Sequence, residues 1–306
     1  MSHHLSNRTS RDLGPWLPVS PCTPRSCITP PAAPAGGWLR LYRYLAALGL
    51  VTVAVVLSVV ARLLRSPLRA RLARAWTTVA VGALGIRRTI RASGTAPRGA
   101  LVVANHISWL DPLVLAAWRP CRMVSEIEVS TWPVIGNVVA SSGTIFHDRD
   151  NLRLLPVTIE KVTRALRQGD TVVVFPEATT LCGGEMGRFH PAFFQAAIDA
   201  GVPVRPLALR YRAAGRMATD PAYIGEDTMA ISMRRIVRSS GMIAEVIELP
   251  EIATGDLPGS RYDRRILAGL AQAAVAGALG EDTTAPVVQY PKERCPVSDS
   301  ALVAMS

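Results

Sequence analysis

The chain has 306 residues, 49% of them hydrophobic and 19% charged, which excludes a wholly disordered protein and allows a large buried core. Its net charge of +11 is unevenly distributed, because residues 13–110 contain twelve arginines and no acidic residue, whereas residues 111–306 contain 20 basic and 22 acidic residues. Nucleic-acid binding needs a basic face on a folded domain. These arginines instead surround an apolar run, which disfavours nucleic acid as a partner and favours an anionic membrane.

The cysteines give little sign of a disulfide framework or a metal site. They are five in number and contain no CxxC pair: Cys22, Cys27, Cys121, Cys182 and Cys295. An odd number without paired spacing predicts neither a disulfide scaffold nor a zinc site. We therefore expect a body in a reducing, cytosol-facing environment, with no bound metal.

The N-terminal part of the chain predicts a leader and a membrane segment. Residues 1–37 are rich in proline, serine and arginine, which predicts a disordered leader. Residues 44–61 form an uncharged run of 18 residues. As a helix this run would be about 27 Å long, slightly shorter than a bilayer core of about 30 Å. A buried helix of a soluble domain is the alternative.

The arginines that follow this run favour a membrane-associated helical segment over residues 38–86. Their excess on that side of the run places the following body in the cytoplasm. A second apolar stretch, residues 75–86, is too short to span a bilayer. It is expected to lie in the membrane interface or to pack on the body.

Residues 87–280 alternate between short apolar runs and segments of helical periodicity, which predicts an α/β domain with a mixed sheet covered by helices. The expected strands are residues 88–92, 100–104, 122–125, 144–147, 171–175, 204–210 and 243–247. The expected helices are residues 152–168, 191–200, 227–238 and 261–279. Residues 281–306 lose the pattern and are predicted to be a disordered tail.

Polar residues follow two of the expected strands. Residues 100–104 lead into Asn105, His106 and, five residues beyond His106, Asp111. Asp111 before Pro112 could simply cap a helix, and His106 could be a hydrogen-bonded structural residue. A strand-to-helix turn can nevertheless bring the two side chains together. A carboxylate that holds one imidazole nitrogen leaves the other free as a general base.

The strand at residues 171–175 is ended by Pro176 and delivers Glu177 to the same kind of position. Open α/β sheets place their sites beyond the carboxyl ends of strands. Glu177 is therefore expected either to serve a site or to accept hydrogen bonds from a loop arginine or from backbone amides.

These residues resemble the motifs of the glycerolipid acyltransferase family, the PlsC-like lysophosphatidate acyltransferases. Asn105-His106-x4-Asp111 matches the first motif, residues 175–179 resemble the third, and residues 202–206 resemble the fourth. The second block is represented by Glu126, Pro133, Gly136, Gly143, Ile145, Phe146 and Arg149. The blocks occur in the order of the family within residues 88–250, behind the apolar run.

The resemblance implies an enzyme that moves an acyl chain from acyl-CoA or acyl carrier protein to the free hydroxyl of a lysophospholipid. The expected acceptor is 1-acyl-sn-glycerol-3-phosphate, which would give phosphatidic acid. His106 would be the general base and Asp111 the residue that orients it. The implied substrate-binding residues are Asn105, Arg149, Glu177, Ala178, Thr179, Thr180 and Arg188. Membrane lipids and the acyl donor are the expected partners, no bound cofactor is expected, and the expected location is the cytoplasmic membrane.

Two departures from the family pattern affect the expected acceptor. The third motif of the family usually has glycine at the position of Ala178 and arginine at the position of Thr180. Because Thr180 stands where the family has arginine, one expected phosphate ligand is missing. Arg188 could replace it, or could be an exposed loop charge. Another lysolipid such as lyso-ornithine lipid, a CoA-independent transacylase and a non-catalytic lipid-binding protein therefore stay open. Cys182, close to this motif, is interpreted as structural.

Overall fold

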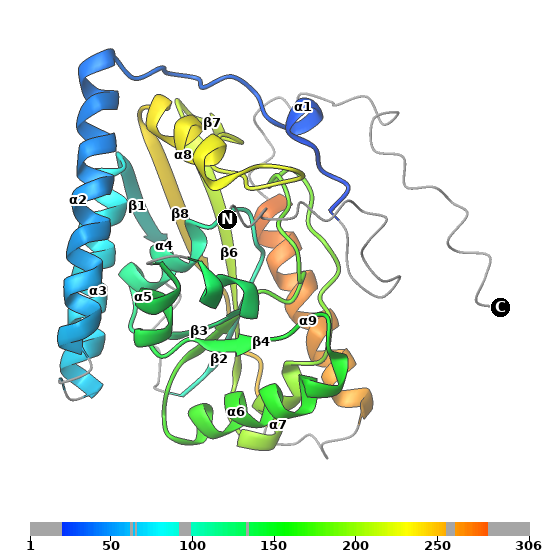
Figure 1. Cartoon of the computed structure of the whole chain (residues 1–306). Helices are drawn as coiled ribbons and strands as arrows, with labels where there is room; N and C mark the ends of the chain where they lie inside the picture. The colour runs from blue at the N-terminus through cyan, green and yellow to red at the C-terminus, as the bar shows by residue number, and fades with distance from the viewer. Residues whose placement is uncertain are drawn as a thin grey trace.

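The computed structural model describes residues 20–61, 64, 66–91, 99–132, 135–254 and 261–280. Residues 1–19 of the predicted leader, the predicted tail at 281–306 and Pro133 of the second block lie outside the described residues. Within the described part, one eight-stranded sheet forms the centre of the molecule, and helices cover both of its faces (Figure 1).

The sheet is mixed, as the sequence predicts. Its strand order is β1-β8-β6-β2-β5-β3-β4, and β7 pairs with β6 outside this path. The bounds are β1 Ile86–Arg91, β2 Leu101–Ala104, β3 Arg122–Glu126, β4 Ile145–His147, β5 Val172–Val174, β6 Val204–Ala213, β7 Arg216–Met217 and β8 Met242–Glu248. The pairs of β6 with β8 and with β7 are antiparallel, and the other pairs are parallel.

Alternating side chains of the central strands build two separate hydrophobic clusters. In β2, Val102 and Ala104 belong to one cluster, while Leu101 and Val103 belong to the other. The first cluster lies under α3 (Ser66–Ala83), α4 (Asp111–Trp118) and α8 (Met229–Arg238). The second lies under α6 (Leu155–Arg167), α7 (Phe194–Ala200) and α9 (Arg261–Gly280). Because strand residues alternate between faces, a buried strand needs apolar residues at every position, which is the pattern seen in the sequence.

The expected helices are present: α9 begins at Arg261 as predicted, and the other three have shifted starts. The segment at residues 152–168 begins as a 3-10 turn, η2 (Leu152–Leu154), before α6, and the segments expected from residues 191 and 227 become helical at Phe194 and Met229. The sequence analysis did not predict η1 (Ile127–Thr131) or α5 (Ile135–Ser141). Both are short, and segments of this length carry no clear period.

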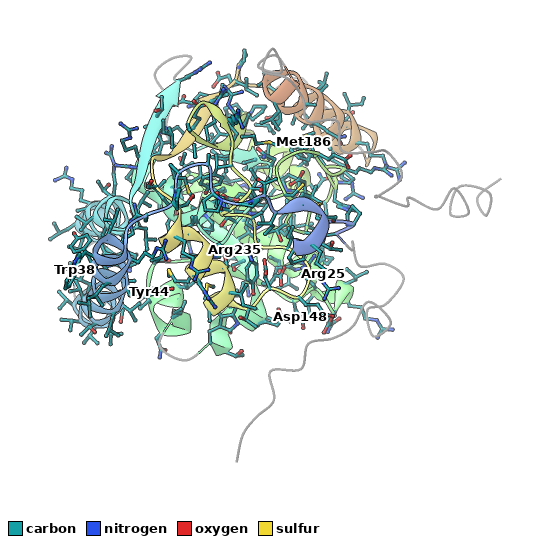
Figure 2. The ribbon with its side chains drawn as sticks, turned by 90° about the horizontal axis from the view of Figure 1, so that it is seen from above. Arg25, Trp38, Tyr44, Asp148, Met186 and Arg235 are labelled. Atoms are coloured by element: carbon teal, nitrogen blue, oxygen red, sulfur yellow. The ribbon has the colours of Figure 1, made fainter. Side chains whose placement is uncertain are left out.

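Helix α2 (Gly37–Ala61) is the one described helix that is long and apolar enough to cross a membrane, judged by length and composition. It lies beside α3 along one flank of the molecule (Figure 1). Trp38 is 86% exposed, and Figure 2 shows it at the outer edge of α2. Only 17% of the apolar window of α2 is buried, which disagrees with the alternative of a buried helix in a soluble domain.

The second apolar stretch forms the end of α3 and packs on the body. Ala80 and Val81 are buried, whereas Val79 on another side of the helix is 59% exposed. The Trp76 indole N–H donates to the Leu50 carbonyl at 3.2 Å and so links α3 to α2. One side of α3 thus contacts the body while another remains uncovered.

The prediction of a disordered leader over residues 1–37 is wrong for residues 20–36. This segment contains the short helix α1 (Pro24–Cys27) and crosses the body before α2 begins (Figure 1). Its backbone is hydrogen-bonded to the body: Thr29 N–H donates to Thr219 Oγ1 at 2.9 Å and Ala35 N–H to the Arg238 carbonyl at 2.7 Å. Proline-rich composition predicts little regular structure, but it does not prevent an irregular segment from docking.

Candidate active site

The candidate site lies where β2 and β5 end. These strands are parallel neighbours, with Leu101 beside Val172 and Val103 beside Val174, so the residues that follow them meet at one edge of the sheet. His106 N–H donates to Glu177 Oε2 at 2.6 Å, which joins the first and third motifs directly. Tertiary pairing of the two strands therefore brings together the polar residues singled out in the sequence.

The turn after β2 places His106 against Asp111. His106 Nδ1 lies 2.8 Å from Asp111 Oδ2, and the same oxygen accepts the backbone N–H groups of Ile107 at 2.7 Å and Ser108 at 2.8 Å. The other oxygen, Oδ1, accepts the Tyr211 hydroxyl at 2.7 Å. Asp111 is completely buried. Four donors hold this carboxylate in place, so the imidazole is fixed through its Nδ1 side.

The alternative that Asp111 serves only as the N-cap of the following helix, α4, does not hold. The helix begins at Asp111 itself, its N-cap is Leu110, and no side chain caps it. The carboxylate instead turns back toward residues 106–108. Pro112 still occupies the first turn of α4, where its missing N–H has no cost.

The imidazole of His106 is packed on one face and partly open. It stacks on Phe175 with ring centroids 4.0 Å apart and an interplanar angle of 15°. Its side chain is 21% exposed. Because Asp111 engages Nδ1, Nε2 is the nitrogen left to receive a proton from a substrate.

Glu177 is a buried acceptor of backbone hydrogen bonds, one of the two structural roles expected for it. Its side chain accepts N–H groups from His106 at 2.6 Å and from Gly187 at 2.7 Å. Burial raises the pKa of Glu177 to about 7, against the opposing effect of these two hydrogen bonds. The Glu177 side chain therefore joins the turn that contains His106 to the segment after β5 that contains Gly187.

The rest of the third motif supports the same turn. Ala178 adopts the left-handed conformation, φ +53°, at the position where the family usually has glycine. Thr180 donates its hydroxyl to the Tyr223 carbonyl, so it does not replace the missing arginine as a phosphate ligand. Thr179 is half-buried. Leu181 N–H donates to the His106 carbonyl at 2.9 Å, which adds a second link between the two motifs.

Asn105 joins strands in this structure. Its amide nitrogen donates to the Leu209 carbonyl at 2.9 Å, and its amide oxygen accepts the Leu209 N–H at 2.8 Å. Asn105 is also only 3% exposed. These contacts give it a positioning role between β2 and β6, and do not support the substrate contact implied by the resemblance.

Arg149 and Arg188 both influence His190, whose backbone N–H donates to the Pro176 carbonyl of the third motif at 2.9 Å. Burial and then the positive charges of Arg188 and Arg149 lower the pKa of His190. Arg149 forms an ion pair with Glu126, both members of the second block. Arg188 is exposed and directly follows Gly187, whose N–H binds Glu177. Both arginines thus contribute positive charge to the region of His190, which follows the third motif.

Tyr211 and Phe175 are site residues that the sequence analysis did not assign. Tyr211 lies in β6 one residue beyond the expected end of that strand, and Phe175 directly follows β5. Phe175 belongs to the third motif but was given no role there, and no local pattern marks Tyr211, because its importance comes from a contact with Asp111 far away in the chain.

An oriented imidazole at the carboxyl ends of parallel strands, beside a basic region, defines a site that can deprotonate a hydroxyl of an anionic substrate. Comparisons with known proteins give the family. Residues 87–210 match the family model described as Acyltransferase. Lyso-ornithine lipid O-acyltransferase of Pseudomonas aeruginosa is 35% identical over 217 residues, 70% of this chain and 80% of that protein. The 1-acyl-sn-glycerol-3-phosphate acyltransferase of Neisseria gonorrhoeae is 39% identical over 128 residues, 42% of this chain and 50% of that protein.

A solved structure confirms the fold. The crystal structure of the 1-acyl-sn-glycerophosphate acyltransferase PlsC of Thermotoga maritima aligns with a TM-score of 0.59 at 18% identity, over 80% of this chain and 94% of that one. The chain belongs to the acyltransferase family and is an acyltransferase of the PlsC-like type.

Proposed function

We propose that the enzyme transfers an acyl chain from a thioester, acyl-CoA or acyl carrier protein, to the free hydroxyl of a lysolipid whose head group carries a phosphate or a carboxylate. The observation that carries this proposal is the geometry of His106, which is held at Nδ1 by the buried Asp111 and is partly exposed. An alcohol is a weak nucleophile at neutral pH, so a positioned base is the main requirement of the reaction.

The reaction follows from that geometry. His106 Nε2 takes the hydroxyl proton while the alcohol oxygen attacks the thioester carbonyl, and Asp111 stabilises the imidazolium that forms. The tetrahedral intermediate then collapses, the carbon–sulfur bond breaks, and the imidazolium returns the proton to the departing thiolate. The products are the ester and a free thiol, and no acyl-enzyme intermediate is needed.

The basic region formed by Arg149 and Arg188 would bind the head group. A guanidinium group is permanently charged and can bind a phosphate or a carboxylate through two parallel hydrogen bonds. The ion pair of Arg149 with Glu126 holds that side chain near the site, whereas Arg188 is exposed on its loop. Glu177, which is saturated by backbone amides, would act by positioning the motifs.

Two acceptors fit this description, 1-acyl-sn-glycerol-3-phosphate and lyso-ornithine lipid. The phosphate of the first suits a pair of arginines. Thr180, in place of the arginine usual in the third motif, favours the second, because its hydroxyl is bonded to the Tyr223 carbonyl and cannot replace that ligand. The longer match to a lyso-ornithine lipid acyltransferase also supports the second acceptor.

We place the enzyme at the cytoplasmic membrane with its body facing the cytoplasm. Helix α2 has the length and composition of a membrane span. An open pocket of about 630 Å³ between α3, β1 and α4 is lined by Arg71, Arg74 and Arg88 together with apolar residues. Juxtamembrane arginines gain about 1 kcal/mol each from an anionic surface, which would orient α3 toward the lipid head groups.

The direct test supplies the detergent-solubilised full chain with radiolabelled acyl-CoA or acyl carrier protein and with each acceptor separately. Transfer to one or both acceptors is expected, and His106→Ala should lower the rate by about 10³-fold or more. Lys161→Ala, on the exposed side of α6, is the matched control and should retain full activity.

The alternative functions give different results in the same assay. Transfer only from an intact phospholipid would identify a transacylase, and lysolipid binding without turnover would identify a non-catalytic binding protein. Equal rates for the wild type and His106→Ala would disprove the assigned base.

A further inference from the structure

Three cysteine thiols from two distant segments meet beside the candidate site. In the N-terminal segment, Cys22 precedes α1 and Cys27 is its last residue. Cys182 follows the third motif. Their sulfur atoms all lie within 4.8 Å of one another. The sequence spacing gives no hint of this cluster, because the third thiol is contributed by a loop far along the chain.

The cluster is built into the hydrophobic core. Cys22 is 3% exposed and Cys182 is 9% exposed, and both belong to the cluster of buried residues on that face of the sheet. Helix α1 is seated closely, since a Cβ on Gly225 would lie 2.9 Å from Pro24 Cδ. Figure 2 shows α1, which carries the labelled Arg25, lying across the body. The thiols are thus held together by packing on both segments.

The segment from Cys182 to Glu185 forms a turn around the sulfur of Cys182. Gly183 has φ +89°, a conformation that suits glycine, and a Cβ on Gly184 would lie 3.7 Å from Cys182 Sγ. The backbone of this turn therefore passes close to the sulfur. A thiol binds a metal ion in its deprotonated form, the thiolate.

We propose that Cys22, Cys27 and Cys182 form a three-thiolate site for a thiophilic metal ion, Zn²⁺ or Cu⁺. Thiolates select these ions, and a Zn–S bond of about 2.3 Å requires sulfurs about 3.8 Å apart, which small side-chain rotations would reach here. On binding, each thiol loses its proton to solvent and forms one metal–sulfur bond. For Zn²⁺, a water molecule would complete the tetrahedral coordination.

A metal ion at this position would fasten the N-terminal segment to the catalytic turn. Cys182 is next to Leu181, whose N–H donates to the His106 carbonyl. The ion would therefore connect α1, which precedes the membrane helix α2, to the loop that holds the first and third motifs together. This role is a clamp and involves no step of acyl transfer.

The test measures metal binding by the reduced full chain in detergent, purified without a metal-affinity resin and loaded separately with Zn²⁺ and Cu⁺. Elemental analysis after gel filtration should give about one equivalent of one of these ions, and Co²⁺ should produce a thiolate-to-metal charge-transfer band. Cys22→Ser and Cys182→Ser should lose this stoichiometric binding, with affinity at least about 10-fold weaker. Cys121→Ser, at a free cysteine outside the cluster, is the matched control and should bind like the wild type.

Cys27→Ser gives an independent variant, because Cys27 is only half-buried and its loss is expected to perturb packing less than that of Cys22. It should weaken binding as Cys182→Ser does. The proposal is overturned if the wild type retains neither ion, or if Cys27→Ser and Cys182→Ser bind as tightly as Cys121→Ser. A non-reduced mass that is lower by two hydrogens in the wild type only would show a disulfide in place of the metal site. These outcomes do not depend on acyl transfer, so they are separate from the test of the proposed function.

Discussion

The arginines of the N-terminal third and those of the catalytic body have different environments. In the body, arginines are paired with carboxylates: Arg122 with Asp170, Arg149 with Glu126, Arg205 with Glu251, Arg210 with Glu245, and Arg235 with Asp227. In residues 13–110 the sequence supplies no carboxylate at all, and three of the arginines line a cavity on α3. The arginines of the body therefore have carboxylate partners within the protein, whereas for those of residues 13–110 an anionic surface would have to supply the negative charge.

Arg43 is an exception that shows how position decides the role. It lies in the apolar helix α2 but is only 4% exposed, and it donates to the carbonyls of Val237 and Ser239 at the end of α8. A Cβ on Gly85 would overlap the Arg43 guanidinium, so that glycine makes room for it. A cation at a helix C-terminus is favourable. Arg43 thus fixes α2 to the body, and is unavailable to lipid head groups.

The largest expected effect comes from changing Asp111, the buried carboxylate that holds His106. Asp111→Asn should lower kcat by about 10⁴-fold, because an amide can donate to Nδ1 and favour the wrong imidazole tautomer. Binding to anionic vesicles should be unchanged, since the N-terminal arginines are intact. Steady-state kinetics and vesicle co-sedimentation measure the two properties. Tyr211→Phe, which removes one donor to Asp111, should reduce kcat less. Wild-type kcat in Asp111→Asn would contradict the assigned role.

Glu177 provides a pH test of burial in the body. Its pKa is raised from an ordinary 4.5 to about 7, so the folded state holds the proton more tightly than the unfolded state. The stabilisation from protonated Glu177 is complete below about pH 4.5 and is lost as the pH rises through about 7. The free energy of unfolding should fall by about 3 kcal/mol over this range. Denaturant unfolding in detergent measures this as the difference between the wild type and Glu177→Gln at each pH. A difference that does not change with pH would disprove the shift.

The outward-facing arginines should respond to salt. Replacing Arg71, Arg74 and Arg88 together by glutamine should weaken binding to anionic vesicles by about 100-fold at low salt, since each arginine contributes about 1 kcal/mol. High salt should reduce the difference from the wild type. The matched control replaces Arg153, Arg164 and Arg167, three exposed arginines at α6, and should leave vesicle binding unchanged. Equal weakening in both triple variants would indicate a general charge effect with no special role for α3.

The smallest expected effect concerns backbone strain next to Glu177. Ala178→Gly should raise the free energy of unfolding by about 1 kcal/mol, because glycine adopts the left-handed conformation without steric cost. Ala214→Gly, at φ +50°, should act in the same direction. Ala165→Gly, inside α6, should destabilise by about 1 kcal/mol and serves as the opposite control. Destabilisation by Ala178→Gly would show that the strain is absent.

Much of the fold and the centre of the site could be predicted from the sequence. The apolar strand patterns located β2 and β5, and parallel strands bring their carboxyl ends to one edge, which is why His106 and Glu177 could be expected to meet. The short segments η1 and α5 could not be found in this way, because a few residues show no reliable period. Composition alone also misjudged residues 20–36, since docking of an irregular segment depends on the surface it meets.

The sequence by itself determined the alternating strands and helices, the apolar helix α2, the acid-free basic third and the spacing of His106 and Asp111. Only the tertiary structure decided which distant groups complete these features. Tyr211 reaches Asp111 from β6, and Cys182 reaches the two cysteines of the N-terminal segment. The physical reason is that periodicity and local turns act over a few neighbouring residues, whereas these contacts arise from strand order and from the packing of loops onto a shared core.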